Sequence, residues 1–229
     1  MKTDNPAGGA RANRALLFDL DGTLCDTLPL IYDAFRDVLL RHTGRRYEDA
    51  EIRPLFGPPE EGVVRRVLSG PAADEALRQY LDLYQERHAR HVSVFPERGR
   101  DLAALRAAGM SLGIVTSKGI GTARISLKET GLDGLFDIVL TGSVGFKPKP
   151  APDGIHLALR ALGVEPGRAA YVGDTLADIK AARAAGCTAV GVLWQDHPDE
   201  RLSAHGSGAD HLFARWDDFV TWAREWAAN

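Results

Sequence analysis

The sequence predicts an α/β protein with a Rossmann-like three-layer core, a mostly parallel sheet and an all-helical cap inserted after the first strand. Two observations support this prediction. From Pro96 onward, short apolar runs alternate with segments of helical period, and repeated strand–helix–strand units imply a parallel sheet covered by helices. Residues 27–90 interrupt that pattern, because they hold helix-period segments and no strand-like run. We therefore expect a flexible tail at 1–14, a core made of 15–26 and 95–229, and a cap at 27–94.

The first strand is expected at residues 15–18, an apolar run that suits a strand buried on both faces. In the cap, apolar residues recur at steps of three and four, as they do on one face of a helix. The clearest sets are Leu28, Ile31, Phe35, Val38 and Leu39; Val63, Val64, Val67 and Leu68; and Leu77, Leu81 and Tyr84. Prolines and glycines between these sets separate the helices.

The remaining elements alternate along the core. Each predicted helix at 98–108, 120–130, 152–162 and 176–185 is followed at once by a glycine, a residue typical of a helix C-terminus. Strands are expected at 111–115, 137–140, 169–172 and 188–193, a polar surface loop at 196–208, and a final Trp-rich helix at 216–226.

The composition excludes several classes of function. The net charge of −3 gives no field that favours nucleic acid or an anionic membrane. No segment approaches the ~18 consecutive apolar residues of a membrane span, and the first residues lack the apolar core of a signal peptide. Two cysteines, Cys25 and Cys187, make no disulfide framework, so we expect reduced thiols and a cytoplasmic protein.

Polar side chains follow three of the predicted strands. Asp19 ends the first strand, Thr116 and Ser117 follow 111–115, and Asp174 follows 169–172 and a glycine. Ligands of an open parallel sheet bind beyond the carboxyl ends of its strands. We therefore expect these side chains to share one edge of the sheet, with Lys147, in the loop after a fourth strand, as the nearby cation.

Four stretches resemble the motifs of the haloacid dehalogenase superfamily, in that superfamily's order. They are DLDGT at 19–23, Thr116, the Lys147 of KPKP, and GDTLAD at 173–178. The match spans about residues 15 to 195. The helical insert, with its LFGPPEEG loop, is similar to the small cap of the phosphoglycolate-phosphatase-like and pyrophosphatase-like branches.

The acidic side chains predict a magnesium site. Asp19, Asp174 and Asp178 together would repel a phosphate ester, and Mg²⁺ resolves that conflict because it binds carboxylates and a substrate phosphate oxygen. The resemblance adds Asp21 as a ligand through its backbone carbonyl. Thr116, Ser117 and Lys147 are expected to hold the phosphoryl oxygens, and Lys118 to contact the distal end of the substrate.

Catalysis is assigned to the two aspartates of DLDGT. Asp19 is expected to act as nucleophile and form an aspartyl-phosphate, while Asp21 acts as general acid and then base. Thr116 and Lys147 complete the catalytic set. The dehalogenases of the superfamily lack the second aspartate, so Asp21 favours a phosphatase.

Structural explanations compete with each of these roles. Asp-Gly after a strand is often only a turn, and Thr116 and Ser117 suit the N-cap of the following helix. Lys147 suits an exposed loop, and Asp178 suits a surface ion pair with Lys180 or Arg183.

The expected function is a Mg²⁺-dependent phosphatase of small phosphorylated metabolites, similar to phosphoglycolate phosphatase. A phosphotransferase or phosphomutase, or an inorganic pyrophosphatase, would use the same site. A non-catalytic binding module that keeps the fold and the metal site is a further alternative. The sequence names no substrate and gives no oligomeric state.

Overall fold

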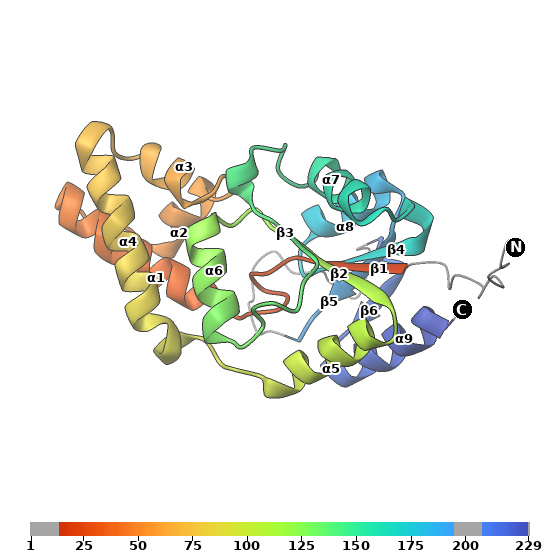
Figure 1. The fold of residues 1–229 in the computed structure, drawn as a ribbon. Coiled ribbons are helices and arrows are strands. Elements are labelled where there is room, and N and C mark those ends of the chain that lie inside the picture. Colours follow the sequence, from red (N-terminus) through yellow and green to blue (C-terminus); the bar gives the residue numbers. More distant parts are fainter. Residues whose placement is uncertain (1–13, 195–207, 229) are drawn as a thin grey trace, which may run out of the picture.

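The computed structural model describes residues 14–194 and 208–228, and within them six strands form one parallel sheet (Figure 1). The strands are β1 (Arg14–Phe18), β2 (Met110–Val115), β3 (Ile138–Leu140), β4 (Ala169–Gly173), β5 (Thr188–Val192) and β6 (His211–Phe213). Their order across the sheet is β3-β2-β1-β4-β5-β6. The predicted α/β fold with a parallel sheet is confirmed, and β6 is the strand that the sequence pattern did not predict.

The centre of the sheet positions the site. Strand β1 lies between β2 and β4, so that Phe18 pairs with Ile114 on one side and with Val172 on the other. The strand order reverses between β1 and β4, and such a point opens a crevice beyond the carboxyl ends of the strands. The polar residues that follow β1, β2 and β4 are therefore brought together.

Helices cover both faces of the sheet. The core helices are α5 (Pro96–Ala107), α6 (Ile120–Glu129), α7 (Asp153–Leu162), α8 (Leu176–Ala185) and α9 (Trp216–Ala228). Leu17 packs with α7 and α8, whereas Leu16 and Phe18 pack into the cluster that holds α5 and α9. This alternation follows from the two-residue period of a strand, and it explains why every residue of the run 15–18 is apolar.

The chain between β1 and β2 is helical from residue 28 to residue 91, apart from short connections (Figure 1). Its helices are α1 (Leu28–Thr43), α2 (Asp49–Ile52), α3 (Glu60–Arg65) and α4 (Gly70–His91). The fully buried rings of Phe35 and Tyr80 join α1 to α4, with centroids 4.3 Å apart. We call residues 28–91 the cap helices; the domain boundaries at 26/27 and 94/95 stay a prediction.

The two connections between the cap helices and the core lie side by side. Arg98, at the start of α5, donates from Nη1 to the carbonyl of Leu24 at 2.6 Å. Its guanidinium also lies 4.2 Å from the centroid of the Phe95 ring. The outgoing and returning segments are thus fixed to each other at the base of the cap helices.

Most predicted boundaries differ from the observed ones by only one or two residues. Strand β1 includes Arg14, so the predicted tail extends one residue too far. The rest of that tail, and the predicted loop at 196–208 up to residue 207, lie outside the described residues.

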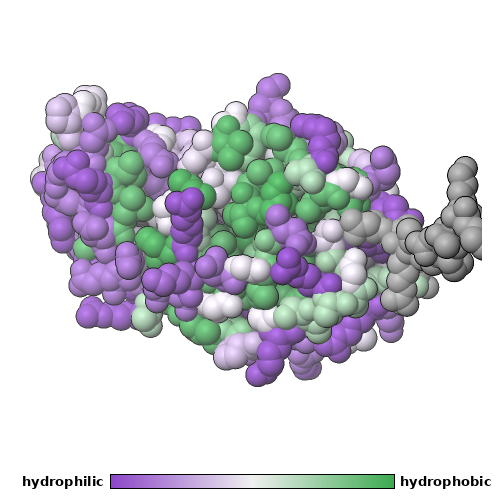
Figure 2. Space-filling view, in the orientation of Figure 1, coloured by the Kyte–Doolittle hydropathy of each residue, from purple (hydrophilic) through white to green (hydrophobic). Residues whose placement is uncertain are grey.

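Apolar residues gather in the middle of the face drawn in Figure 2, and polar residues predominate at its margins. No helix of the described segments is long and apolar enough to cross a membrane.

Candidate active site

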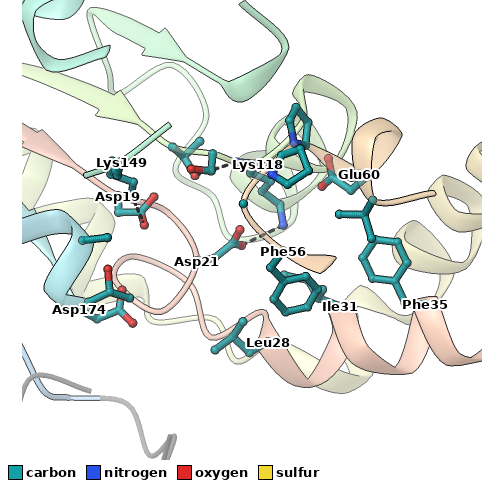
Figure 3. Close-up of a pocket in the computed structure, with 18 of the residues that line it drawn as sticks. Asp19, Asp21, Leu28, Ile31, Phe35, Phe56, Glu60, Lys118, Lys149 and Asp174 are labelled. Atoms are coloured by element: carbon teal, nitrogen blue, oxygen red, sulfur yellow. Dashed lines mark hydrogen bonds and ion pairs between the residues drawn. The ribbon is translucent and has the colours of Figure 1, made fainter. Parts of the chain in front are cut away.

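A cavity of about 290 Å³ lies between the carboxyl ends of the central strands and the cap helices (Figure 3). Charged and hydroxyl side chains from the core line one part of it: Asp19, Asp21, Thr116, Ser117, Lys118, Lys149, Asp174 and Thr175. Apolar side chains, mostly from the cap helices, line the other part. The structure thus brings six of the predicted site residues to one cavity: Asp19, Asp21, Thr116, Ser117, Lys118 and Asp174.

Asp19 is fixed at the end of β1. Its backbone N–H donates to the carbonyl of Val172 at 2.9 Å, which continues the β1–β4 ladder by one residue. Its Oδ1 accepts from the backbone N–H of Leu20 at 2.8 Å. The Asp19 side chain is therefore held with one oxygen on the backbone and the other directed at Lys149.

The cation of the site is Lys149, not Lys147. Lys149 Nζ lies 2.6 Å from Asp19 Oδ2, 2.6 Å from Asp178 Oδ1 and 3.2 Å from the hydroxyl of Tyr171. These contacts use all three ammonium protons. The prediction that Lys147 is the cation beside Asp19 is wrong. Lys147 is exposed and does not line the cavity, whereas Lys149, two residues later, contacts Asp19.

Asp178 is fully buried and holds Lys149. Its Oδ2 accepts from the backbone N–H and the hydroxyl of Thr175 at 3.0 and 2.5 Å, and the Thr175 hydroxyl accepts in return from the Asp178 N–H. This capping box begins α8. Asp178 therefore makes a buried pair with Lys149 rather than the surface pair with Lys180 or Arg183 that was an alternative.

Three carboxylates meet at this edge of the sheet. Asp19, Asp174 and Asp178 each offer one oxygen, and these oxygens lie within 4.8 Å of one another. Burial, with Asp178 and Asp19 as further causes, raises the pKa of Asp174 to about 8. Burial also raises the pKa of Asp19 to about 6, although Lys149 opposes that change.

This donor set fits a magnesium ion. Mg²⁺ takes hard oxygen ligands, usually one or two carboxylates. Within residues 14–194 and 208–228, Asp174 has the hydroxyl of Thr23 at 3.0 Å as its partner and no ion pair. Asp19 and Asp174 are therefore the side chains whose charge a cation would balance, whereas Asp178 already has Lys149.

Gly22 makes room for Asp174. Its φ is +80°, a conformation that side chains other than glycine rarely adopt. A Cβ at this position would lie 2.3 Å from Asp174 Oδ2. The glycine of DLDGT is therefore required by the turn and also by the carboxylate packed against it.

Asp21 points away from the three-carboxylate cluster, toward the cap helices (Figure 3). Its Oδ1 accepts from Lys118 Nζ at 2.9 Å and from the hydroxyl of Thr27. The predicted role of Asp21 as a metal ligand therefore rests on its backbone carbonyl and not on its side chain. Asp21 lines the cavity, and its role as proton donor stays a prediction.

Lys118 is buried, with 1% of its side chain exposed. Burial lowers the pKa of its ammonium, but the nearby Asp21, Tyr84 and Glu60 more than compensate, so the pKa is raised overall. Its Nζ also lies 4.6 Å from the centroid of the Tyr84 ring. Lys118 therefore lines the cavity as a cation whose charge is balanced by Asp21.

Thr116 and Ser117 line the cavity and do not cap α6, whose N-cap residue is Gly119. The Thr116 N–H donates to the carbonyl of Leu140 at 3.0 Å, and its Oγ1 accepts from the Lys118 N–H at 3.3 Å. The chain from 116 to 119 is thus a tight loop at the end of β2.

Glu60 is the site residue from the cap that the sequence analysis did not name. It is buried, and its Oε2 accepts from the backbone N–H of Gly119 at 2.7 Å, while Oε1 accepts from the hydroxyl of Thr122. Burial raises the pKa of its carboxyl, and Lys118 opposes this. The sequence pattern indicated a loop at LFGPPEEG, and nothing local in it indicated that Glu60 contacts the core.

This site and fold define a class of protein. The chain belongs to the haloacid dehalogenase-like hydrolase family, whose model matches residues 16–192, and it is a phosphatase of that family. It is 34% identical over 209 residues to the pyrophosphatase PpaX of Bacillus velezensis, a match that covers 90% of this chain and 94% of that protein. It is 37% identical over 196 residues to the probable phosphatase IndB of Dickeya dadantii, covering 82% and 85%.

A third relative is the phosphoglycolate phosphatase of Neisseria meningitidis, 34% identical over 190 residues, with 79% and 80% of the two chains covered. Among solved structures, a predicted phosphoglycolate phosphatase from Haemophilus somnus has a TM-score of 0.77 at 25% identity, covering 94% of this chain and 99% of that one. CbbY from Rhodobacter sphaeroides in complex with phosphate has a TM-score of 0.72 at 25% identity, covering 87% and 93%.

Proposed function

We propose that this phosphatase is Mg²⁺-dependent and hydrolyses a small phosphate monoester through an aspartyl-phosphate on Asp19. The observation that carries the proposal is the position of Asp19, at the end of β1 in the cavity, in contact with Lys149 and beside Asp174. A carboxylate held between a buried ammonium and a cation site meets a phosphate ester without net repulsion.

Asp19 acts as nucleophile. One of its oxygens forms a bond to phosphorus while the bond between phosphorus and the leaving oxygen breaks, and the leaving oxygen takes a proton from Asp21. Water then attacks phosphorus and gives a proton to Asp21, and the bond between Asp19 and phosphorus breaks. Both aspartates return to their starting states, and one phosphate is released.

The other residues of the core neutralise and position the phosphoryl group. Lys149, which Asp178 orients, faces the Asp19 side of the cavity, and the Thr116 and Ser117 loop supplies hydrogen-bond donors. Phosphoryl transfer depends mainly on such positioning and on charge neutralisation. Lys118 Nζ donates to Asp21 Oδ1 at 2.9 Å and so fixes the position of the Asp21 carboxyl in the cavity.

We assign the metal to Asp19 and Asp174, with Asp178 beside them and the backbone carbonyl of Asp21 as a further ligand. When bound, Mg²⁺ supplies positive charge to the phosphoryl oxygens. The cap helices, taken as a domain at 27–94, close over the cavity and exclude water during transfer. The cavity volume of about 290 Å³ supports a small substrate.

The relatives support a phosphate ester or anhydride as substrate, because they are named as pyrophosphatase and phosphoglycolate phosphatase. An inorganic pyrophosphatase is the second candidate, favoured by the 34% identity to PpaX over 209 residues. A phosphotransferase or phosphomutase would use the same groups, and analysis of the products separates it from a hydrolase.

The direct test follows phosphate release from an aryl phosphate. We expect turnover with Mg²⁺, none with EDTA, and a loss of at least about 10³-fold in Asp19→Asn, because the amide cannot attack phosphorus. Acid-quenched wild-type protein should carry phosphate that hydroxylamine removes. The exposed Asp133→Asn is the matched control. Turnover retained in Asp19→Asn would refute the assigned nucleophile.

A further inference from the structure

The two ends of the cavity differ in chemistry (Figure 3). The end at the sheet holds the carboxylates and lysines that act on the phosphoryl group. The opposite end is formed by side chains that are apolar or aromatic, among them Leu28, Ile31, Phe35 and Phe56. The Tyr80 ring, 4.3 Å from that of Phe35, belongs to the same end. The part of a substrate that extends beyond its phosphoryl group therefore lies against an apolar wall.

No unpaired cation of the described residues lines this wall. Lys118 is paired with Asp21 and Lys149 with Asp19 and Asp178. Arg65 pairs with Asp74, and Arg66, which lines an adjoining cavity, donates to the carbonyl of Leu55. A second anionic group at the apolar wall would therefore meet no unpaired cation among the described residues that line this cavity.

The acidic side chain nearest the apolar wall also disfavours a second anion. Lys149 and the proposed Mg²⁺ balance Asp19 and Asp174, and Lys118 balances Asp21, so Glu60 is the carboxyl that a second anionic group would meet. Glu60 lies on the cap side, between the catalytic groups and the apolar wall. An anion at that end is desolvated and meets a carboxyl instead of a donor, which is costly.

One polar atom on the wall has no partner. The hydroxyl of Tyr80 is buried without a hydrogen bond in the described structure, although the residue lines the cavity and is fully buried. Buried hydroxyl groups are nearly always hydrogen-bonded, so an orphaned one at a cavity wall indicates a partner on the ligand.

We propose that the natural leaving group is an uncharged alcohol with an apolar or aromatic body and a hydrogen-bond acceptor for Tyr80, and that a second carboxylate or phosphate is excluded. This inference rests on the proposed function, since it names the substrate class of the same site. It places phosphoglycolate, pyrophosphate and sugar bisphosphates among the poor substrates, and it therefore counts against the pyrophosphatase candidate.

The test compares three substrates that differ in one group. They are benzyl phosphate, 4-carboxybenzyl phosphate and the methyl ester of the latter, with Mg²⁺ present. We expect kcat/KM for benzyl phosphate and the methyl ester to exceed that for the carboxylate at least tenfold. The methyl ester controls for size, because it is larger than the carboxylate but neutral.

The outcomes separate the two proposals. If no substrate is turned over, and an aryl phosphate is not either, the proposed phosphatase mechanism fails. If phosphate is released and the carboxylate is used equally well or better, only the inference about the leaving group is overturned. Efficient turnover of phosphoglycolate in the same assay would overturn it too.

Two variants test the residues that carry the inference. Glu60→Gln keeps the size of the side chain and should raise the ratio of kcat/KM for the carboxylate to that for benzyl phosphate several-fold. Glu86→Gln, at an exposed position on α4 and absent from the cavity lining, is the control and should keep the wild-type ratio. Tyr80→Phe should lower the ratio of the methyl ester to benzyl phosphate; an unchanged ratio would remove Tyr80 from the proposal.

Discussion

Lys149 shows how much one side chain organises in this protein. Its side chain is 9% exposed. It pairs with Asp19, which follows β1, and with Asp178, in the first turn of α8. Burial lowers the pKa of its ammonium, but Asp178 and Asp19 outweigh this, so the pKa is raised overall. The lysine is therefore charged at any physiological pH, and two buried carboxyl groups depend on it.

Alanine substitutions at Lys149 and at Lys147 should show that only Lys149 supports activity and stability. In Lys149→Ala we expect phosphate release to fall at least about 10²-fold. We also expect the free energy of unfolding to fall by about 3 kcal/mol or more, since the substitution leaves buried carboxylates unpaired. The matched Lys147→Ala removes an exposed side chain and should stay within about 0.5 kcal/mol of wild type. Equal effects in the two variants would contradict the contacts of Lys149. Activity assays and urea unfolding measure both quantities.

Sequence patterns predicted the residues at strand ends but not the choice between the two lysines. Asp19, Thr116 and Asp174 each follow an apolar run, so the pattern fixes where they lie. Lys147 and Lys149 flank Pro148 in a loop without a period. Which of them reaches Asp19 depends on the path of that loop over the sheet, and no local pattern records this path.

Among the elements, α4 and α6 form one of the contacts that join the cap helices to the core. The hydroxyl of Tyr84 on α4 lies 2.8 Å from Ser126 Oγ on α6, and His88 Nε2 lies 3.3 Å from the same oxygen. His88 is 1% exposed. Burial lowers its pKa and Lys118 adds to this, whereas Glu129 opposes it.

This contact should weaken in acid. Because the pKa of His88 is lower in the folded protein than its ordinary value of 6.5, the unfolded chain takes up the proton first. Stability is therefore complete above about pH 6.5 and is lost as the pH falls toward the folded pKa. Urea unfolding between pH 7.5 and 5.5 should show a flatter pH dependence in His88→Gln than in wild type. His156→Gln, on α7, controls for loss of a histidine elsewhere; a slope unchanged by His88→Gln would contradict the assignment.

Most helices and strands could be predicted from the sequence, but β6 and the contact of Glu60 with the core could not. Apolar periodicity and the terminal glycines located α5 to α8 to within two residues. Strand β6 was missed because three residues, half-buried at the edge of the sheet, show no alternation long enough to detect. Glu60 was missed because its partners, Gly119 and Thr122, lie about sixty positions further along the chain.

At the scale of the whole molecule, the three-carboxylate cluster links metal binding to stability. In EDTA, the carboxyl of Asp174 has a pKa of about 8 instead of 3.8, so the folded protein holds a proton that the unfolded chain releases. The metal-free protein should therefore lose stability as the pH rises from about 4 to 8. Asp174→Asn removes this charge, and at pH 8 in EDTA it should melt at a higher temperature than wild type.

With Mg²⁺ present, the wild type should melt at a higher temperature than Asp174→Asn. At a concentration a hundred times its Kd, a ligand adds about 2.7 kcal/mol to the stability of the folded state. For a chain of this size, this raises the Tm by roughly 5–10 °C. Differential scanning fluorimetry should show this rise in wild type and in Asp133→Asn, and none in Asp174→Asn. An equal rise in Asp174→Asn would place the ion elsewhere.

The contact of Glu60 with the loop at 116–119 has a consequence for evolution and for engineering. A methyl group on the α-carbon of Gly119 would lie 2.1 Å from Glu60 Oε2. A residue other than glycine at 119 would therefore displace the Glu60 carboxylate from the Gly119 N–H and weaken the contact between α3 and the loop. That contact depends on a position that contributes no side chain.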